Sequence, residues 1–248
     1  MLLGLMGAMP EEMDKIIDAL TDKKVVERGS RLYYRGKLYG QEVVAVFSRW
    51  GKVAAATTAT NLIVEFGVDR IVFTGVAGAI SDDLNIGDVV IAQRLFQHDM
   101  DARPLMRRFE IPLTGKTSYE ISEQNSGLMV EAVHNFLKNN NQLRNFAMEQ
   151  HAPTPKLMLG DIASGDLFIS GTEMKKALIR NLPSVVCAEM EGAAVAQVCN
   201  DFDVPLTVVR IISDTADEQA HTSAIGFVNQ YGGEYSLAIL REYIQLLK

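Results

Sequence analysis

The chain has 248 residues, of which 48% are hydrophobic and 22% are charged, and its formal net charge is −7. These values are typical of a globular protein and exclude a disordered, collagen-like or coiled-coil chain. The acidic balance argues against nucleic acid or an anionic membrane surface as a partner.

Apolar runs that are typical of buried strands alternate with helical patterns along most of the chain. In chain order, the patterns predict a strand at 2–6, a helix at 10–20, a hairpin of strands 32–38 and 42–47, a helix at 52–66, strands at 70–74 and 88–92, a helix at 123–138, a strand at 157–164, a helix at 172–181, a strand at 185–188, a helix at 192–202 and a strand at 206–212. The remaining C-terminal segment is mostly helical, with a candidate break at Gly232–Gly233, and long loops are expected at 101–120 and 139–155. This alternation indicates one α/β domain over residues 1–248, with a largely parallel or mixed sheet covered on both faces.

Cysteine content and the length of the apolar runs bear on the compartment. Cys187 and Cys199 are too few for a disulfide framework, so a reducing compartment fits. No segment reaches the roughly 18 uninterrupted apolar residues that a membrane-spanning helix needs. The apolar start of the chain has no basic leader and is closely followed by Glu11 and Glu12, unlike a secretory signal. We therefore expect a cytoplasmic protein with no membrane partner.

The strand expected at 206–212 contains an arginine, Arg210, in an otherwise apolar run. A buried arginine requires carboxylates that pair with it, so Arg210 predicts acidic residues nearby. Ser213 and Asp214 follow at the carboxyl end of this strand, where open α/β sheets place their ligands. The alternative is an edge strand with a solvated Arg210 and with Asp214 as a helix cap.

Two further groups of acids stand where a strand passes into a helix. Glu189 and Glu191 precede an apolar helix, and Glu11 and Glu12 follow Pro10 at the start of the first helix. Acids in a first helical turn also complement the helix dipole, so each group has a purely structural interpretation. At the first helix, however, a carboxylate stands where a phosphate would normally be cradled, and it could repel phosphate and hold a water molecule.

Other stretches carry weaker signals. The glycine-rich turn expected at 75–78 would let a ligand approach backbone amides, but it is not a dinucleotide fingerprint. Phe168 follows a Gly-Asp turn and could stack on a flat base, although a phenylalanine is more often part of a core. His98, Asp99 and Asp101 could bind a metal ion, but no further ligand cluster accompanies them, and we expect no metal site.

Six stretches taken together resemble the 5′-methylthioadenosine/S-adenosylhomocysteine nucleosidases of the nucleoside phosphorylase superfamily. They span almost the whole chain at matching spacing, at 7–12, 51–55, 74–78, 164–169, 188–192 and 209–217. The resemblance implies a three-layer α/β/α sandwich around a mixed, partly barrelled central sheet, and a homodimer. It also implies hydrolysis of the N-glycosidic bond of an adenine nucleoside, which releases adenine and a 5-thioribose product without metal or cofactor.

The resemblance further implies a role for each matching catalytic position. Asp214 is expected to protonate N7 of adenine, with Ser213 orienting it, and Glu12 is expected to hold and activate the water. Glu191 is expected to bind the ribose hydroxyls. Arg210 is expected to pair with the site carboxylates and to position the water.

Further residues are implied to contact the small-molecule substrate. Phe168 is expected to stack on adenine, with the backbone of Ile169 reading its edge and Met190 lying against the ribose. The remaining expected contacts come from Met9, Trp50, Val76, Gly78, Glu189 and Phe227. A loop of the other subunit is implied to complete the 5′ pocket, with the candidates Phe109, Ile111 and Pro112.

Three positions depart from the family pattern and leave the 5′ substituent open. Trp50 stands where a small aliphatic residue is common, and Val76 stands where a serine is common. Ala224 stands where a phenylalanine often covers the substrate, although Phe227 follows one helical turn later. The main alternative substrate is therefore another 5′-substituted adenine nucleoside, such as aminodeoxyfutalosine.

Two other functions are less compatible with these residues. A phosphorylase should offer arginines where Glu11, Glu12 and Val76 stand. A catalytically silent nucleoside-binding protein would not need four charged residues of the implied site together, namely Glu12, Glu191, Arg210 and Asp214.

Overall fold

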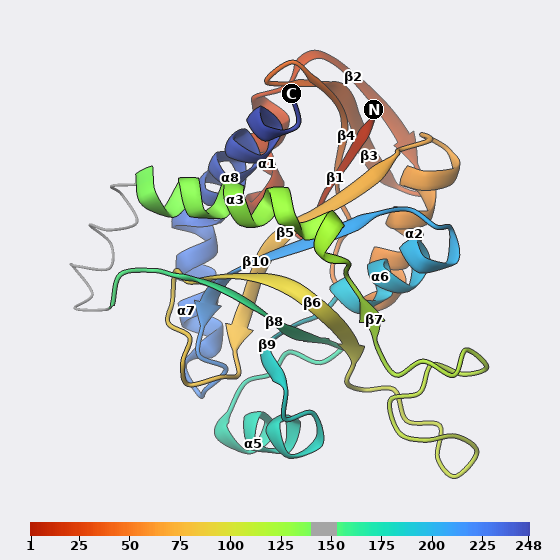
Figure 1. Ribbon diagram of the computed structural model, residues 1–248, viewed down its shortest axis with the longest axis vertical. Coiled ribbons are helices and arrows are strands. Elements are labelled where there is room, and N and C mark those ends of the chain that lie inside the picture. Colours follow the sequence, from red (N-terminus) through yellow and green to blue (C-terminus); the bar gives the residue numbers. More distant parts are fainter. Residues whose placement is uncertain (140–152) are drawn as a thin grey trace.

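A mixed sheet of ten strands forms the centre of the computed structural model, which describes residues 1–139 and 153–248 (Figure 1). The strands are β1 (Leu3–Gly7), β2 (Thr21–Arg28), β3 (Arg31–Leu38), β4 (Gln41–Phe47), β5 (Arg70–Ala79), β6 (Val89–Gln97), β7 (Tyr119–Glu120), β8 (Leu157–Ser164), β9 (Val185–Glu189) and β10 (Leu206–Asp214).

Some of these strands close into a barrel. β5 pairs with both β10 and β9, β10 pairs with β6, β6 with β8, and β8 with β9, which completes the ring. Beyond β5, the strands β1, β4, β3 and β2 continue the sheet, and β7 pairs with β6. β1, β5 and β10 are parallel, so their carboxyl ends meet at one edge of the sheet.

Helices cover both faces of the sheet (Figure 1). α2 and α6 pack together on one face, whereas α1, α3 and α8 pack together on the other. The helices of the described residues are α1 (Pro10–Asp18), α2 (Lys52–Val64), α3 (Glu123–Asn139), α5 (Thr172–Asn181), α6 (Gly192–Asp201), α7 (Ala220–Phe227) and α8 (Gly233–Leu246), with a π-helical turn, η1 (Val228–Gly232), between α7 and α8.

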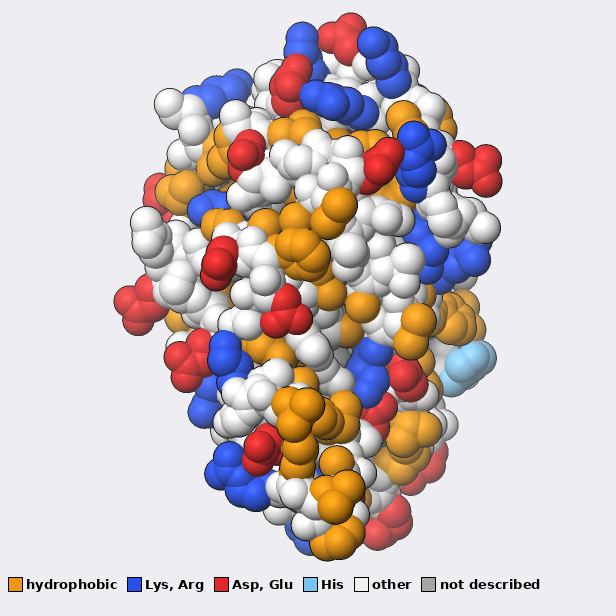
Figure 2. All heavy atoms as spheres, turned by 90° about the vertical axis from the view of Figure 1, so that its right-hand side faces the viewer, with side chains coloured by type: hydrophobic (Ala, Val, Ile, Leu, Met, Phe, Trp, Pro, Cys, Tyr) orange, Lys and Arg blue, Asp and Glu red, His pale blue; other side chains and the backbone are white. Residues whose placement is uncertain are grey.

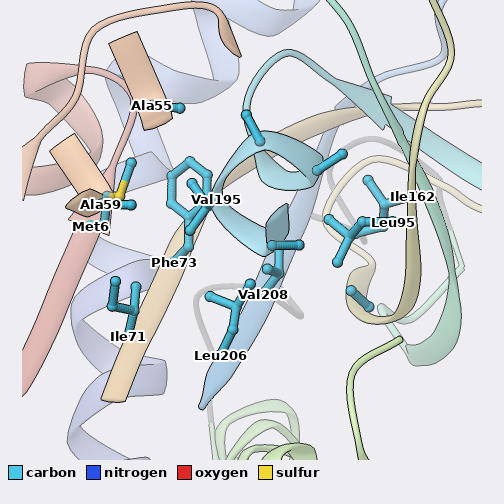
Figure 3. Close-up of a cluster of buried hydrophobic side chains, with 14 of the residues drawn as sticks. Met6, Ala55, Ala59, Ile71, Phe73, Leu95, Ile162, Val195, Leu206 and Val208 are labelled. Atoms are coloured by element: carbon cyan, nitrogen blue, oxygen red, sulfur yellow. The ribbon is translucent and has the colours of Figure 1, made fainter. Parts of the chain in front are cut away.

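The sheet divides most of the hydrophobic core into two layers. Along β5, Ile71 and Phe73 belong to the cluster that packs against α2 and α6, whereas Val72 belongs to the cluster with α1, α3 and α8. This is the alternation of a strand that is buried on both faces. Figure 3 shows the first layer, in which Ile71, Phe73 and Val208 face Val195 and Ala59. The predicted α/β/α sandwich with a partly barrelled sheet is confirmed.

Four elements differ from the prediction. β2 has no apolar alternation because almost all of its side chains are exposed, and it is a strand because it pairs with β3. β5 and β6 continue further than predicted, so the glycine-rich segment 75–78 is strand and not a turn. Gly232 and Gly233 do not break the C-terminal helix, since both keep helical dihedral angles with φ of −53° and −70°.

The two predicted long loops have different outcomes. The chain between β6 and β7 has no helix or strand, as predicted for most of 101–120. Most of the loop predicted at 139–155 lies outside the described residues. Among residues 1–139 and 153–248, none of the helices has the length and apolar character that crossing a membrane requires.

Candidate active site

A cavity of about 650 Å³ opens where β1, β5 and β10 end. Its wall is formed by the turn after β1, the last residues of β5, the loop after β8, the end of β9, and one face of α7 and η1. The sequence predicts a ligand at this edge of the sheet, because the carboxyl ends of parallel strands meet there.

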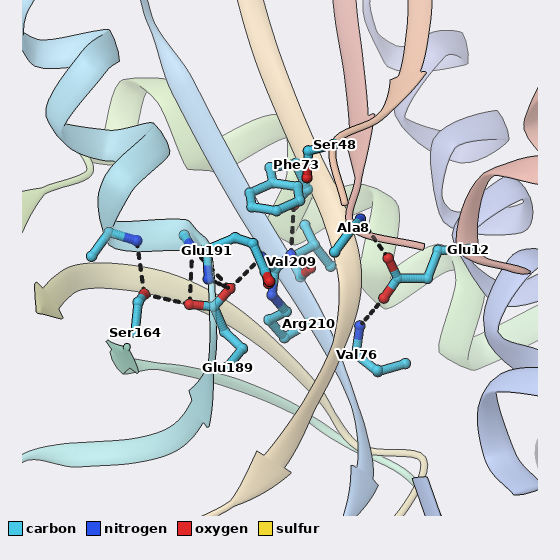
Figure 4. A network of polar contacts seen from close by, with 12 residues as sticks. Ala8, Glu12, Ser48, Phe73, Val76, Ser164, Glu189, Glu191, Val209 and Arg210 are labelled. Atoms are coloured by element: carbon cyan, nitrogen blue, oxygen red, sulfur yellow. Dashed lines mark hydrogen bonds and ion pairs between the residues drawn. The ribbon is translucent and has the colours of Figure 1, made fainter. Parts of the chain in front are cut away.

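Glu12 is almost fully buried in this wall, and its carboxylate accepts three backbone hydrogen bonds. Oε2 accepts from the N–H groups of Ala8 at 2.7 Å and Met9 at 3.0 Å, and Oε1 accepts from that of Val76 at 3.0 Å (Figure 4). The carboxylate thus occupies the N-terminal end of α1, where anions bind well. Burial raises the pKa of Glu12, against the lowering effects of Arg210 and of these amides. A carboxyl group with a raised pKa can exchange a proton with water closer to neutral pH.

Asp214 ends β10 and is equally buried. Its Oδ2 accepts a hydrogen bond from the Ser213 hydroxyl at 2.8 Å, and its Oδ1 accepts one from the Ala216 N–H at 2.9 Å. Burial raises the pKa of Asp214 more than these two bonds lower it. Asp214 therefore keeps a proton to higher pH than an ordinary aspartate, which is what a general acid requires.

Two glycines of β5 make room for these carboxylates. A Cβ atom on Gly75 would lie 2.6 Å from Oε1 of Glu12, and a Cβ atom on Gly78 would lie 2.6 Å from Oδ1 of Asp214. From the sequence, we expect these glycines to let a ligand approach the backbone. In the structure they first of all admit the two acidic side chains of the chain itself.

Arg210 is fully buried and pairs with a carboxylate, as its place in an apolar strand predicts. Nη2 donates to Oε2 of Glu189 at 2.7 Å, and Nη1 donates to the backbone oxygens of Val209 at 3.1 Å and Phe73 at 3.3 Å. The guanidinium also lies 4.1 Å from the centroid of the Phe73 ring. Arg210 does not line the cavity, whereas its partner Glu189 does. The positive charge of Arg210 is therefore separated from the cavity by the side chain of Glu189.

Glu189 is the centre of this polar network (Figure 4). Besides Arg210, its carboxylate accepts hydrogen bonds from the Ser164 hydroxyl, the Glu191 N–H at 3.1 Å and the Gly192 N–H at 2.8 Å. Both oxygens are engaged by the protein. Glu189 therefore orders the start of α6 and the residue beside it, Glu191, although its side chain also touches the cavity.

Glu191 lines the cavity next to Glu189. Its Oε1 accepts a hydrogen bond from the Gly51 N–H at 2.8 Å, which joins α6 to the start of α2. Burial and the charge of Glu189 raise the pKa of Glu191 to about 8. Glu191 therefore keeps its proton to higher pH than an ordinary glutamate does.

We expect a Glu191→Gln variant to gain thermal stability relative to the wild type as the pH rises from about 5 to about 9. The ordinary pKa of 4.5 rises to about 8 on folding, so between these values the folded state binds the extra proton. Wild-type stability from this group consequently falls as the pH rises, whereas glutamine has no proton to lose. Thermal unfolding of both proteins at both pH values measures the difference. Glu42→Gln, at an exposed position of β4, is the control, and a difference that does not change with pH would contradict the prediction.

The predicted substrate contacts meet around the same cavity. Trp50 and Phe168 lie at its rim with 66% and 43% of their surfaces exposed. The ring of Phe168 meets that of His221 edge-on, with 6.4 Å between the centroids. The cavity wall also contains the other predicted contacts Met9, Val76, Gly78, Ile169 and Met190.

Phe227 does not line the cavity, in contrast to the prediction. It is 4% exposed and packs against Tyr231 and Tyr235 in the core. The side chains of α7 and η1 that do line the cavity are His221, Ala224, Ile225, Val228 and Asn229. With about 100° per residue, these positions form one stripe, and Phe227 lies about 130° away from its centre.

The loop between β6 and β7 also differs from the expectation. Phe109 and Ile111 are 9% and 4% exposed and pack inside their own chain, so they are not available to a second subunit. Pro112 is exposed, and the large apolar side chains that this loop exposes are Leu105 and Leu113.

Several cavity residues were not predicted from the sequence, and Glu11 was predicted only as part of a helix start. The missed residues are Leu167, His221, Ile225, Val228 and Asn229. Two signals point to them. Leu167 follows β8 and the others follow β10, at the edge where ligands are expected, and positions 221, 224, 225 and 228 repeat at the spacing of one helix face.

Two of the three candidate metal ligands, Asp99 and Asp101, are engaged in ion pairs. Asp99 pairs with Lys52 at 2.7 Å, and Asp101 pairs with Arg103 at 2.5 Å. Among residues 1–139 and 153–248, no three His, Cys, Asp or Glu side chains are grouped so that they could hold a metal ion.

The fold and the cavity define an α/β protein that binds a small molecule between buried carboxyl groups at the end of its sheet. The sequence model of the phosphorylase superfamily matches residues 2–245. The chain therefore belongs to the phosphorylase superfamily, and the family predicted from its motifs is confirmed.

Comparison with individual relatives shows which members of the superfamily the chain is similar to. The chain is 35% identical to the aminodeoxyfutalosine nucleosidase of Helicobacter pylori strain J99, over 92% of each protein. It is 33% identical to the 5′-methylthioadenosine/S-adenosylhomocysteine nucleosidase of Staphylococcus haemolyticus, over 99% of this chain and 100% of the relative. The solved structure of the corresponding nucleosidase from S. pneumoniae with a transition-state inhibitor matches with a TM-score of 0.86 over 100% of both chains, at 29% identity.

Proposed function

We propose that this protein hydrolyses the N-glycosidic bond of 5′-substituted adenine nucleosides. The observation that carries the proposal is a pair of buried carboxyl groups on one cavity, Glu12 after β1 and Asp214 at the end of β10, both with a raised pKa. Both curated relatives described above are named nucleosidases, which supports the same class of reaction.

In the proposed reaction, two protons move. Asp214 donates its proton to N7 of adenine while the bond between N9 and C1′ breaks, so adenine leaves as a neutral base. Positive charge develops on the ribose. Glu12 takes a proton from a water molecule, and the water oxygen forms the new bond to C1′. The two carboxyl groups then exchange protons with the solvent and return to their starting states.

Glu191 stabilises the charge that develops on the ribose. The ribose hydroxyls donate hydrogen bonds to its carboxylate, and such bonds favour the charged form of a carboxyl group whose pKa is otherwise raised. A negative charge that is fixed close to the ribose favours the oxocarbenium-like transition state. Arg210 holds Glu189, and Glu189 in turn holds the backbone of Glu191 in place.

Water, and not phosphate, is the proposed nucleophile. The backbone amides that a phosphate would use at the start of α1 already bind Glu12. Glu11 also lies on the cavity wall and adds a second acidic group at this place. Both features disfavour an incoming phosphate.

The proposed substrates are 5′-methylthioadenosine and S-adenosylhomocysteine. Phe168 stacks on adenine, the backbone of Ile169 reads its edge, and Met190 lies against the ribose. The second candidate is aminodeoxyfutalosine, which is favoured by the 35% identity to a nucleosidase named for that substrate.

Release of adenine from each candidate nucleoside, with and without phosphate and in the presence of a chelator, tests the proposal. Release that needs neither phosphate nor a free divalent metal ion is the expected result. Strict dependence on phosphate would replace the hydrolase by a phosphorylase. The ratio of kcat/KM values for the candidates decides between them.

We expect Gly78→Ala to lower kcat at least about tenfold, because the new methyl group displaces the carboxyl group of Asp214 from its place and general acid catalysis is worth more than this factor. The measurement is steady-state adenine release. Gly127→Ala is the matched control, since among the described residues a Cβ atom there meets no atom within 4 Å outside the backbone of its own helix. Equal kcat values for the two variants would contradict the proposed place of Asp214.

We further propose that the protein works as a homodimer. The side of the molecule that carries α2, α6 and the loop between β6 and β7 exposes large apolar side chains, among them Val53 at 78%, Leu105 at 87% and Leu113 at 93%. Figure 2 shows hydrophobic side chains gathered on this side. Light scattering at micromolar concentration measures the mass in solution, and a monomeric mass would contradict the proposal.

A further inference from the structure

Trp50 stands out among the cavity residues because its side chain is large, apolar and unburied. It lines the cavity, and yet 66% of its surface is exposed. An exposed indole is a broad apolar surface that can stack on a flat group of a ligand. It is also the only tryptophan of the chain.

The backbone beside Trp50 is held firmly by polar contacts. The N–H of Gly51 donates to Glu191 at 2.8 Å, and the N–H of Lys52 donates to Oδ1 of Asp166 at 2.8 Å. The ammonium group of Lys52 binds Oδ1 of Asp99 at 2.7 Å, and Oδ2 of Asp99 accepts from the N–H of Asp166 at 2.9 Å. These contacts close a ring between the start of α2 and the loops after β6 and β8. The backbone next to the indole is thus fixed, whereas most of the surface of Trp50 itself is exposed.

The contacts of its neighbours place Trp50 along the cavity. Gly78 lies against Asp214, and Asp214, as the proposed acid for N7, lies at the end of the cavity where adenine binds. Gly51, next to Trp50, donates to Glu191, which marks the place of the ribose hydroxyls. Trp50 is therefore on the ribose side of the cavity and not at the base, an assignment that rests on the proposed function.

We propose that Trp50 is a stacking surface for the 5′ substituent and that it selects adenine nucleosides whose 5′ substituent is planar and apolar. An aromatic 5′ group would cover an indole that a methylthio group covers only in part. Aromatic pairs gain about 0.5–1.5 kcal/mol beyond their buried area, which corresponds to a preference of roughly 2- to 12-fold in kcat/KM.

The test compares 5′-phenylthioadenosine with 5′-methylthioadenosine as substrates of the wild type, Trp50→Leu and Trp50→Phe. We expect the ratio of the two kcat/KM values to favour the phenylthio compound in the wild type. The ratio should fall roughly 2- to 12-fold in Trp50→Leu and return most of the way in Trp50→Phe, which restores an aromatic ring. A merely structural role of Trp50 would lower both kcat/KM values together and leave their ratio unchanged, and that result would overturn the proposal.

The single tryptophan gives a second measurement that does not depend on turnover. In an Asp214→Asn background, 5′-phenylthioadenosine should change the emission of Trp50 strongly, and adenine alone should leave it nearly unchanged. Equal changes with both compounds would overturn the placement of Trp50. If no nucleoside is hydrolysed by the wild type, the proposed function fails, whereas hydrolysis without any selectivity at Trp50 contradicts this inference alone.

Discussion

Asp214→Asn should lower kcat for adenine release by about 10²- to 10⁴-fold, which is the usual contribution of a general acid. Asparagine has nearly the same shape, and its carbonyl oxygen can still accept the hydrogen bond that Ala216 donates to Asp214. It has no acidic proton, so adenine would have to leave without protonation at N7. KM should change much less than kcat, because the cavity keeps its form.

Steady-state kinetics and thermal unfolding together check this expectation. A normal melting temperature with a low kcat separates lost chemistry from lost structure. Asp83→Asn, at an exposed position outside the cavity, is the matched control and should keep the wild-type kcat. The alkaline decrease of activity that depends on the proton of Asp214 should also disappear in Asp214→Asn. An Asp214→Asn variant with more than about a tenth of the wild-type kcat would contradict the role of this group as the acid.

Glu12→Gln should cause a loss of the same order, about 10²- to 10⁴-fold in kcat, because an amide cannot accept the proton of the attacking water. The backbone N–H groups around Glu12 are a second reason for a lower kcat, because they fit two acceptor oxygens and not an amide group. The two oxygens of Glu12 accept from Ala8, Met9 and Val76, whereas glutamine has one oxygen, so its NH₂ group would face at least one of these donors. Some loss of thermal stability should accompany the loss of kcat.

The neighbouring residue offers the control for this experiment. Glu11 lines the same cavity but is exposed, so Glu11→Gln removes a charge from the same place without removing a buried acceptor. We expect Glu11→Gln to keep most of the wild-type kcat. An equal loss of kcat in the two variants would show that only the local negative charge matters for the rate, and would rule out Glu12 as the base.

The predictions that succeeded depend on rules that hold wherever a residue is buried. An arginine inside an apolar strand must find a carboxylate, and Arg210 finds Glu189. Strands that are buried on both faces are mostly apolar, so β10 could be recognised from its sequence. β2 could not, since its exposed side chains carry no pattern and its pairing with β3 is a property of the whole sheet.

The predictions that failed concern the direction in which a side chain points, which the sequence alone does not determine. Phe227 follows Ala224 closely along α7, but the rotation of this helix about its axis decides which of the two faces the cavity. In the same way, an apolar side chain in a long loop can pack against its own chain or against a neighbour, and Phe109 and Ile111 pack against their own chain.

The backbone amides around Glu12 form an anion-binding site, and the anion that occupies this site is a side chain of the same molecule. A ligand tethered in this way competes at an effective concentration on the order of millimolar or more, and it never diffuses away. Dissolved oxyanions would have to displace it, while a neutral water molecule needs only to lie beside it. In the proposed reaction, the choice between water and phosphate as the nucleophile is thus made when the chain folds, before any nucleoside binds.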